Sequence, residues 1–533
     1  MARLGSFLAR TCCMALIAVQ RLGRRRRLTV LCVALIPVLY AVRVSMTAPL
    51  PYPVIHDEFS YVLGAETLAL GRLTNPPHPL ADHFVAPQIL VRPTYASKYP
   101  IGQAAFLALG LVLFGSAHWG AILTMALCAG ASVWATRIWT TRGWALISGC
   151  HIVLVFGLDH YWARSYWGGG VAFLGAILVL GAYGLTLRRQ GAGAGAPLAA
   201  GMALLFFSRP YEGFCLTMAV FLAIAWHARK DPGLRPSIVR IAAIVGLIMV
   251  AAVAFQLRIN YVVTGHAGTL PYVEHQRQYL WESPFWFRDA QRTPKAAVLE
   301  RHREAEFQHY LHFHQQGALR SLRENGENLL RLLEQNVTRI GFLVVLLLAT
   351  IDSVPAGLVL IPLAAATGLI LEAWMFPHYA APLFAAVWML QYRVLHGITR
   401  LRLRRQRAGA VIAVAFLATA TAGPMLRAGS GMLRPASPAR HPRQNVEDYL
   451  RSLGGKHVVL VKRSADYDPH VEWVFNSANI DEASIVWARD LGAANVAVFA
   501  YYSERRIWEC EPEVSIPGSA LPKLTELSPS NIR

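Results

Sequence analysis

Charged residues are scarce in this sequence, and their scarcity excludes an ordinary soluble globular protein. Only 15% of the 533 residues are charged and 55% are hydrophobic, whereas about a quarter of the residues of a soluble domain are charged. The seven cysteines show none of the spacings of a disulfide or metal-binding framework. Acidic residues are few as well: 31 Asp and Glu stand against 51 Lys and Arg, a formal net charge of +20.

The positive charge is concentrated in short tracts beside apolar runs. These tracts are Arg24–Arg27, Arg188-Arg189, Arg229-Lys230 and Arg400–Arg407. The pattern is typical of cytoplasmic loops under the positive-inside rule, with anionic lipid headgroups as partners. A nucleic-acid-binding protein would instead carry its positive charge as one patch or stripe. We therefore expect membrane lipids, and no nucleic acid, among the partners.

Apolar runs near twenty residues long recur, which is the signature of membrane-spanning helices. We predict about eleven spans, at 28–49, 119–136, 144–159, 169–187, 197–208, 211–227, 238–257, 337–351, 354–372, 377–395 and 409–425. The run at 101–116 is shorter, and we predict that it lies at the membrane interface. The sequence then divides into a basic cytoplasmic leader (1–27), a membrane domain (28–425) and a polar tail (443–533).

The positive-inside rule also predicts an orientation. The N-terminus lies in the cytoplasm, and two long polar segments, 50–118 and 258–335, lie outside an inner (cytoplasmic) membrane. The first should contain an amphipathic helix over 58–71 that ends at Gly71, followed by a proline-rich run. The second should open as an aromatic loop and close as a charged helical stretch from Lys295 to Glu334.

The tail reads as a small extracytoplasmic α/β domain. Strands are predicted at 457–461, 484–488 and 506–510, and helices at 445–453 and 493–503. Its polar candidates are Glu472, Asn476, Asp481 and Arg489. These residues either pair locally and satisfy the backbone or bind an acceptor.

The triplet His56-Asp57-Glu58 follows the first predicted span. Adjacent side chains diverge on a helix or a strand, so the two acids cannot form the opposed pair of a glycoside hydrolase. One carboxylate is enough to take a proton from an acceptor hydroxyl when a sugar leaves a phosphate donor. The leaving phosphate then needs cations rather than an acid, and Arg92, Lys98, Arg164 and Arg209 are on the outer side of the predicted topology. The structural alternatives are a helix N-cap for Asp57, a first-turn dipole contact for Glu58 and an exposed loop position for His56.

Several motifs occur in an order that resembles the GT-C membrane glycosyltransferases, most closely the bacterial group related to protein O-mannosyltransferases and the lipid A aminoarabinose transferase. The acid pair is followed by a run that closes on SKYPIG (97–102), then by YWARSYWGG (161–169), LLFFSRPYEG (204–213) and MFPHYAAPL (375–383). The resemblance covers about residues 28–400. It implies a polytopic α-helical membrane protein of GT-C type, here with an added α/β tail.

The resemblance also implies roles for individual residues. Asp57 takes the place of the catalytic acid and Glu58 that of its neighbour, and Lys98 and Tyr99 lie near the donor phosphate. Arg209 would contact phosphate or sugar, and His378 and Tyr379 would line the donor cavity. The implied activity is transfer of a sugar, with inversion, from a polyprenyl-phosphate donor to a lipid, glycan or protein acceptor. Some relatives use a divalent metal, but no second acidic motif here demands one, so no cofactor and no metal ligands are predicted.

A histidine-rich segment and two other functions provide alternatives to sugar transfer. His302, His309, His312 and His314 lie in a charged segment, and we predict a solvated face for them rather than a metal site. A transporter or flippase of lipid-linked sugars is the main alternative function, but charges within spans, which mark such pathways, are few. A non-catalytic membrane scaffold is the second alternative, and it leaves the Asp57 segment without a role.

Overall fold

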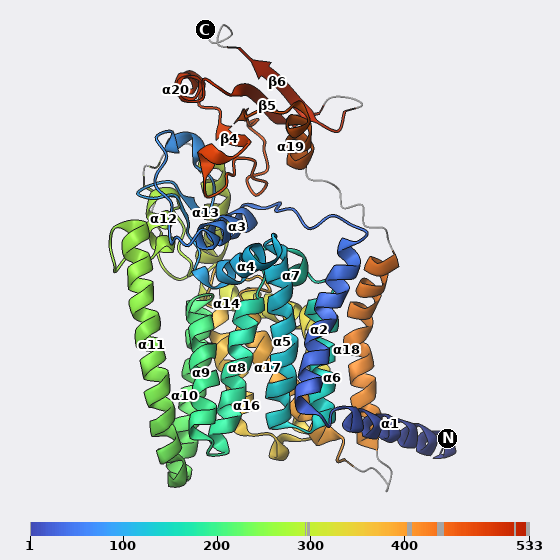
Figure 1. The fold of residues 1–533 in the computed structure, drawn as a ribbon. Helices are drawn as coiled ribbons and strands as arrows, with labels where there is room; N and C mark the ends of the chain where they lie inside the picture. The colour runs from blue at the N-terminus through green and yellow to red at the C-terminus, as the bar shows by residue number, and fades with distance from the viewer. Residues whose placement is uncertain are drawn as a thin grey trace.

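The computed structural model describes residues 2–290, 292–293, 295, 299–401, 408–433, 442–515 and 519–528. Most of the basic tract Arg400–Arg407 therefore lies outside the described residues. The chain forms a bundle of long helices, and a small sheet-containing domain sits beyond one end of that bundle (Figure 1). Shorter helices and loops fill the space between the two parts.

The bundle contains a helix at each of the predicted spans. These helices are α2 (Arg26–Ser45), α5 (His118–Trp139), α6 (Arg142–Ile152) with the π-helical turn Val153–Gly157, α8 (Gly170–Leu187), α9 (Gly191–Phe206), α10 (Pro210–Lys230), α11 (Arg235–Thr264), α15 (Ile340–Leu348), α16 (Ala356–Leu369), α17 (Ala381–Ile398) and α18 (Ala408–Leu433). Within the described residues, 6 helices are long and apolar enough to cross a membrane. The protein is a multi-pass membrane protein, and the count of eleven spans remains a prediction.

Helix α17 forms the centre of the bundle, since it is buried on nearly every side. A helix that is apolar all round belongs in such a position. Its polar groups find partners on α6: Trp388 donates to the Ser148 hydroxyl at 2.9 Å, and the Tyr392 hydroxyl lies 2.8 Å from Nδ1 of His151. These side chains are buried, so the hydrogen bonds join α6 and α17 inside the bundle.

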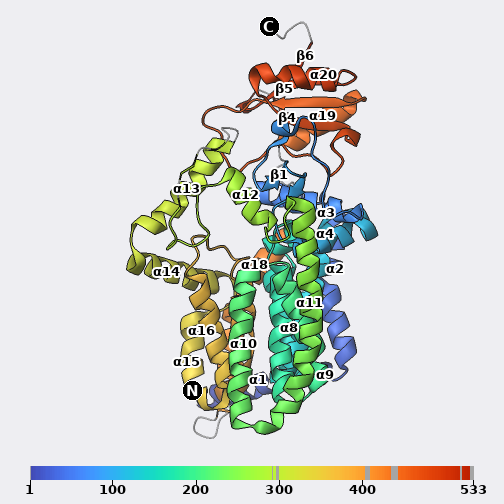
Figure 2. The ribbon, with the colours of Figure 1, turned by 90° about the vertical axis from the view of Figure 1, so that its left-hand side faces the viewer.

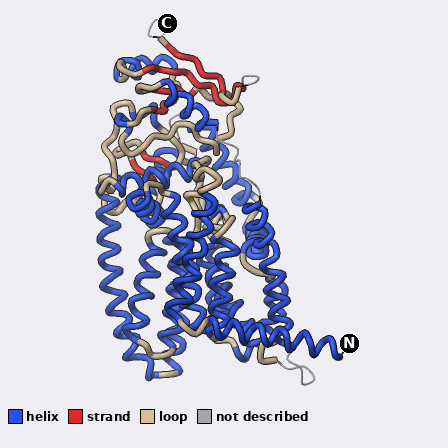
Figure 3. The backbone as a smooth tube through the Cα atoms, turned by 45° about the vertical axis from the view of Figure 1, so that its right-hand side comes forward, coloured by secondary structure: helices blue, strands red, loops and turns tan. Residues whose placement is uncertain are grey.

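The basic turns lie together at one end of the bundle. Arg189 pairs with Asp231 at 2.8 Å, which joins the turn after α8 to the turn after α10. Arg137, at the end of α5, donates to the carbonyl of Gly23 at 3.0 Å. Helix α1 (Ala2–Leu22) lies across this same end (Figures 1 and 3). Clustering of these turns at one end is the arrangement that the positive-inside rule requires.

The opposite end carries the polar segments. Helices α3 (His56–Ala69) and α4 (Ile101–Phe114) lie across it, so α4 takes the position expected of residues 101–116 (Figure 1). The same end also carries α7 (Tyr161–Arg164), α12 (Pro271–Tyr279), α13 (Glu300–Gln315) and α14 (Ala318–Asn336) (Figures 1 and 2). The charged stretch predicted as one helical run is two helices, because Gly317 between them has a φ of +84° that helix does not allow.

The C-terminal domain is a sheet with two helices. It consists of α19 (Pro442–Leu453), β3 (His457–Val461), β4 (Ile485–Arg489), α20 (Val496–Tyr501), β5 (Arg506–Ser515) and β6 (Pro522–Leu527), with strand order β4-β3-β5-β6. Strand β3 is parallel to both neighbours, and β6 is antiparallel to β5. Strand β3 coincides with the predicted one, β4 begins one residue later than predicted, and β5 begins as predicted but continues to Ser515. Strand β6 was not predicted, because it is a largely exposed edge strand with a polar sequence.

The sheet packs directly on the segment that follows α2. The rings of Phe59 in α3 and Phe475 are in contact, with centroids 4.6 Å apart, and Ile55 forms an isolated antiparallel β-bridge with Val471. Within one hydrophobic core, Leu90 of the short hairpin β1–β2 (Ile89–Leu90 and Ala96–Ser97) joins Val458 of β3. The C-terminal domain and the polar segment 50–118 are therefore one packed unit.

Candidate functional site

Asp57 lies in the first turn of α3 and does not cap it. The residue at the N-cap is Ile55, and the helix begins at His56. The carboxylate of Asp57 keeps 18% of its surface exposed. Because Asp57 and Glu58 are adjacent on the helix, their side chains diverge, as the sequence predicts.

Two neutral or cationic donors hold the Asp57 carboxylate. Nδ1 of His56 lies 3.0 Å from Oδ2, and the Tyr99 hydroxyl donates to Oδ1. Burial acts to raise the pKa of Asp57, but the charge and hydrogen bond of His56, the hydrogen bond of Tyr99 and the charge of Lys98 together bring it well below its usual value. Asp57 is therefore ionised at any physiological pH.

The hairpin β1–β2 places Lys98 and Tyr99 against α3. Ser60 of α3 donates to the carbonyl of Gln88 at 2.7 Å, and its hydroxyl lies 2.7 Å from that of Ser97. These bonds fix the chain one residue before Lys98. The ammonium of Lys98 is buried 4.6 Å from the ring centroid of Tyr272, and this burial lowers the pKa of Lys98. A cation and an anion thus face the same small region.

Both carboxylate oxygens of Glu58 accept hydrogen bonds from backbone N–H groups. Its Oε2 accepts from the N–H of Val54 at 2.9 Å, and its Oε1 accepts from the N–H of Tyr166 at 3.2 Å. It therefore closes the N-terminal turn of α3 and joins that turn to the loop before α8. We assign Glu58 a positioning role and no reacting role.

Arg209 reaches the same end of the bundle through a close helix contact. The N–H of Gly102, at the start of α4, donates to the carbonyl of Phe207 at 2.6 Å. A Cβ on Gly102 would meet that oxygen at 2.6 Å, so glycine is needed there. Arg209 follows two residues later, stacks over the ring of Tyr379 at 4.0 Å, and lies 3.8 Å from Glu212.

His378 is surrounded by aromatic side chains next to the contact between Arg209 and Tyr379. Its Nδ1 is 3.1 Å from the hydroxyl of Tyr161, and its ring lies 4.6 Å from that of Trp167. The motifs at 161–169, 204–213 and 375–383 therefore meet in space. The structure brings Asp57, Lys98, Tyr99, Arg209, His378 and Tyr379 to one end of the bundle.

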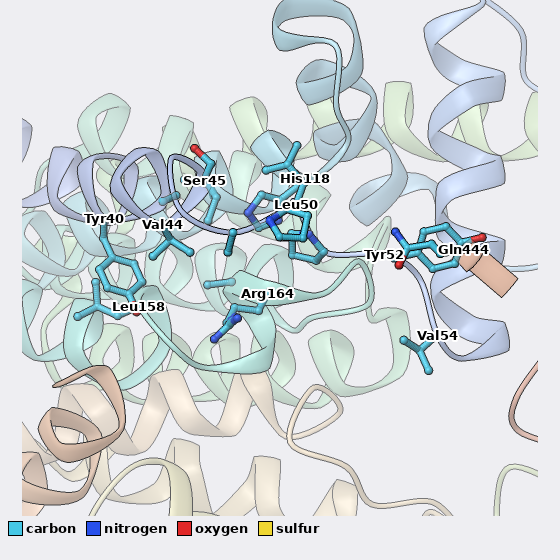
Figure 4. A pocket seen from close by; sticks show the side chains of 16 residues that line it. Tyr40, Val44, Ser45, Leu50, Tyr52, Val54, His118, Leu158, Arg164 and Gln444 are labelled. Atoms are coloured by element: carbon cyan, nitrogen blue, oxygen red, sulfur yellow. The ribbon is translucent and has the colours of Figure 1, made fainter. Parts of the chain in front are cut away.

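Arg164 lies apart from the Asp57 and Lys98 region. Its guanidinium pairs with Asp159. It lines a cavity of about 230 Å³, together with Tyr40, Leu50 and His118, beside the loop that follows α2 (Figure 4). The prediction that Arg164 joins Lys98 and Arg209 at one phosphate is not supported by this placement, because Arg164 points into the cavity beside α2.

The four histidines predicted to share a solvated face do not do so. His302 is 1% exposed and contacts His56, with ring centroids 4.8 Å apart. His309 stacks on Trp374 at 3.8 Å, whereas His312 is exposed. The prediction is wrong for His302 and His309, because α13 packs one face against neighbouring elements instead of standing free in solvent.

Several residues of this region were not predicted from the sequence. They are Tyr272, Glu282, Glu306 and His470, which come from α12, the loop after it, α13 and the C-terminal domain. Burial raises the pKa of Glu306 to about 8, and the neighbouring charge of Glu282 adds to that rise. The spacing of His302 and Glu306 on one helical face was a signal that could have been read, but the others meet only through long-range packing.

The polar candidates of the C-terminal domain pair within that domain or with the polar segment 50–118. Arg489 pairs with Glu472 at 2.8 Å, and Asn476 exchanges hydrogen bonds with the backbone of Trp487. Asp481 lies 3.1 Å from His78. These contacts favour a structural role for all of them over acceptor binding.

Comparison with known proteins agrees with the fold. No family model matches the sequence, and no curated protein matches it. Among solved structures, ArnT from Cupriavidus metallidurans in the apo state is similar with a TM-score of 0.54 at 12% identity, over 92% of this chain and 98% of that one. The same protein bound to undecaprenyl phosphate gives 0.48 at 12% identity, over 89% and 92%. The oligosaccharyltransferase of Archaeoglobus fulgidus in the apo form gives 0.38 at 12%, over 81% and 62%. The first of these likenesses shows that the chain has the GT-C fold.

Proposed function

We propose that this chain is an inverting glycosyltransferase. It moves a sugar from a polyprenyl-phosphate donor to an acceptor hydroxyl at the outer face of an inner membrane, with Asp57 as the general base. The observation that carries this proposal is the Asp57 carboxylate, held by Tyr99 and His56 beside the buried ammonium of Lys98. In a GT-C bundle this anion–cation pair lies at the end opposite the basic turns, where a lipid-borne phosphate would meet it.

The proposed step is a single displacement. The acceptor oxygen attacks the anomeric carbon from the face opposite the phosphate, and the bond between that carbon and the phosphate oxygen breaks with its electron pair. Asp57 accepts the proton of the attacking hydroxyl and later passes it to water. One displacement inverts the anomeric centre and releases polyprenyl phosphate.

The low pKa of Asp57 makes it a weak base in the resting site. Efficient proton transfer needs acid and base of similar strength at the moment of transfer. The acceptor hydroxyl becomes acidic only as its oxygen bonds to carbon, so Asp57 takes the proton late. Its main task before then is to accept a hydrogen bond and orient the hydroxyl.

Lys98 and Arg209 would stabilise the charge that develops on the leaving phosphate. The ammonium of Lys98 is buried, and the guanidinium of Arg209 is 16% exposed and fixed over Tyr379. Cations fixed in place and shielded from water act more strongly than mobile ones. His378 and Tyr379 would pack against the donor, while lipid, glycan and protein hydroxyls are all acceptable acceptors for this chemistry.

The test uses the purified full chain in lipid nanodiscs with radiolabelled polyprenyl-phosphate sugars and a panel of acceptors. Transfer of label to an acceptor is expected from the wild type, and a loss of more than about 100-fold from Asp57→Asn. The control is Asp82→Asn, which removes an exposed carboxylate of the same segment that pairs with Arg92. Equal transfer by Asp57→Asn and wild type would remove the base assignment, and movement of intact donor across vesicles without transfer would favour a flippase.

A further inference from the structure

Four side chains from three distant parts of the sequence meet beside Asp57. They are His56 at the start of α3, His302 and Glu306 on one face of α13, and His470 in the loop that leads to the Val471 bridge. One ligand atom from each lies within 4.8 Å of all the others. Nε2 of His56 is 3.3 Å from Nδ1 of His470, which equals the separation of about 3.3 Å between ligands 2.0–2.1 Å from a tetrahedral metal ion.

His302 gives an independent indication that this cluster binds a cation. Its side chain is 1% exposed, and within the described part of the chain neither ring nitrogen has a hydrogen-bond partner. Buried polar atoms nearly always have a partner. The carboxylate of Glu306 is 3.9 Å away, too far for a hydrogen bond. A bound cation would satisfy a nitrogen of His302 and the Glu306 carboxylate together.

The hydrogen bonds of the His56 ring also support a cation in this cluster. Nδ1 of His56 faces Oδ2 of Asp57 at 3.0 Å and the Gln88 amide at 3.3 Å, so Nε2 is left to face the cluster. A histidine that binds a metal typically donates its second N–H to a carboxylate, which fixes its tautomer. The Asp57 carboxylate also supplies negative charge that offsets the nearby ammonium of Lys98.

We propose that His56, His302, Glu306 and His470 bind a divalent transition-metal ion of the zinc class. Imidazole and carboxylate ligands of this number suit zinc and exclude the oxygen-only coordination of calcium. Because His470 belongs to the C-terminal domain, the ion clamps that domain onto α3 and α13. It also fixes the His56 ring against Asp57. The proposed metal site is independent of the proposed sugar transfer, because metal binding and the attachment of the C-terminal domain do not require that activity.

The experiment measures metal binding to the purified full chain in detergent after treatment with a chelator and removal of that chelator. Zinc alone is added back, and bound zinc is counted by mass spectrometry after gel filtration. Wild type is expected to retain about one equivalent and to melt at a higher temperature with zinc than without it, since a ligand that binds only the folded state stabilises it. Cobalt added in place of zinc should give the visible absorption of a tetrahedral site.

The variants are His302→Gln and His470→Gln, with His312→Gln as the matched control. His312 lies on the same helix, is exposed and is 3.1 Å from Glu324, so its loss leaves the cluster intact. Because His470 is exposed, we expect its substitution to leave folding intact. Gel filtration of the variant verifies this. Loss of the zinc equivalent and of the zinc-dependent melting shift in both variants, but not in the control, supports the site. Equal zinc retention by all four proteins, or none by the wild type, overturns it.

Discussion

The hydroxyl of Tyr99 donates a hydrogen bond to the carboxylate of Asp57. Tyr99 follows the hairpin β1–β2, and its ring stacks on that of Tyr61 with centroids 4.5 Å apart. Tyr61 lies one turn along α3 from Asp57. The helix thus holds both the acid and the ring that orients its hydrogen-bond donor.

Substitution of Tyr99 by Phe is expected to slow transfer with little loss of folding. The ring and its stacking remain, while a hydrogen bond to a charged group, worth about 1.5–3 kcal/mol, is lost. We expect kcat to fall roughly 10- to 100-fold, with a smaller change in KM for the donor. Steady-state kinetics with a radiolabelled donor would measure both. An unchanged kcat would show that Asp57 needs no donor at Oδ1.

Substitution of Lys98 by Gln is expected to lower kcat/KM for the donor by about 10²–10³. The buried ammonium is lost, so charge on the leaving phosphate is less well stabilised. The comparison is Lys523→Gln, which removes a half-exposed lysine that pairs with Glu511 in the C-terminal sheet. The same kinetic assay applies to both. If the two variants behaved alike, Lys98 would have no part in phosphate stabilisation.

Glu66 gives a pH dependence to the docking of the C-terminal domain. Its Oε2 accepts from the N–H of Ala478 at 2.9 Å, and burial raises its pKa from 4.5 to about 7, although that hydrogen bond acts to lower it. Between these values the folded chain holds a proton that the unfolded chain has released. The free energy of unfolding therefore falls as pH rises from about 4.5 to about 7 and shows no further loss from Glu66 above that.

The check is thermal unfolding of the protein in detergent from pH 4.5 to 8. The shift corresponds to on the order of 3 kcal/mol between the two ends of the window. Glu66→Gln keeps the acceptor and removes the titration, so its melting temperature should fall less over that range. Parallel pH profiles for variant and wild type would contradict the assignment.

Substitution of Gly102 by Ala tests the helix contact that positions Arg209. An added Cβ would lie 2.6 Å from the carbonyl oxygen of Phe207, and backbone there cannot yield cheaply. We expect a destabilisation of about 1–3 kcal/mol and a loss of transfer. Gly246→Ala in α11 is the control, since nothing lies within 4 Å of its Cβ position, and helix propensity favours alanine there by up to about 1 kcal/mol. Melting temperatures that fell equally would show that the contact is not specific.

Local features of the sequence predicted much of the fold. Apolar runs located the helices of the bundle, and Gly71, with a φ of +72°, follows the end of α3 where the pattern put it. Strands β3 to β5 were evident as short β-branched and aromatic runs. These features are local because they depend on side chains a few residues apart. Strand β6 and the break at Gly317 were missed, because an exposed edge strand and a single turn carry little hydrophobic periodicity.

The sequence by itself determined that this is a multi-pass membrane protein with polar segments at one end, since charge and apolar length decide which residues can enter a bilayer. It also singled out Asp57, Lys98 and Arg209 as candidates through motif order. Only the tertiary structure decided that Arg164 lines another cavity, that Glu58 is held by backbone N–H groups, and that His56, His302 and His470 meet. Contacts between segments hundreds of residues apart depend on how helices and sheet pack, and no local pattern records that packing.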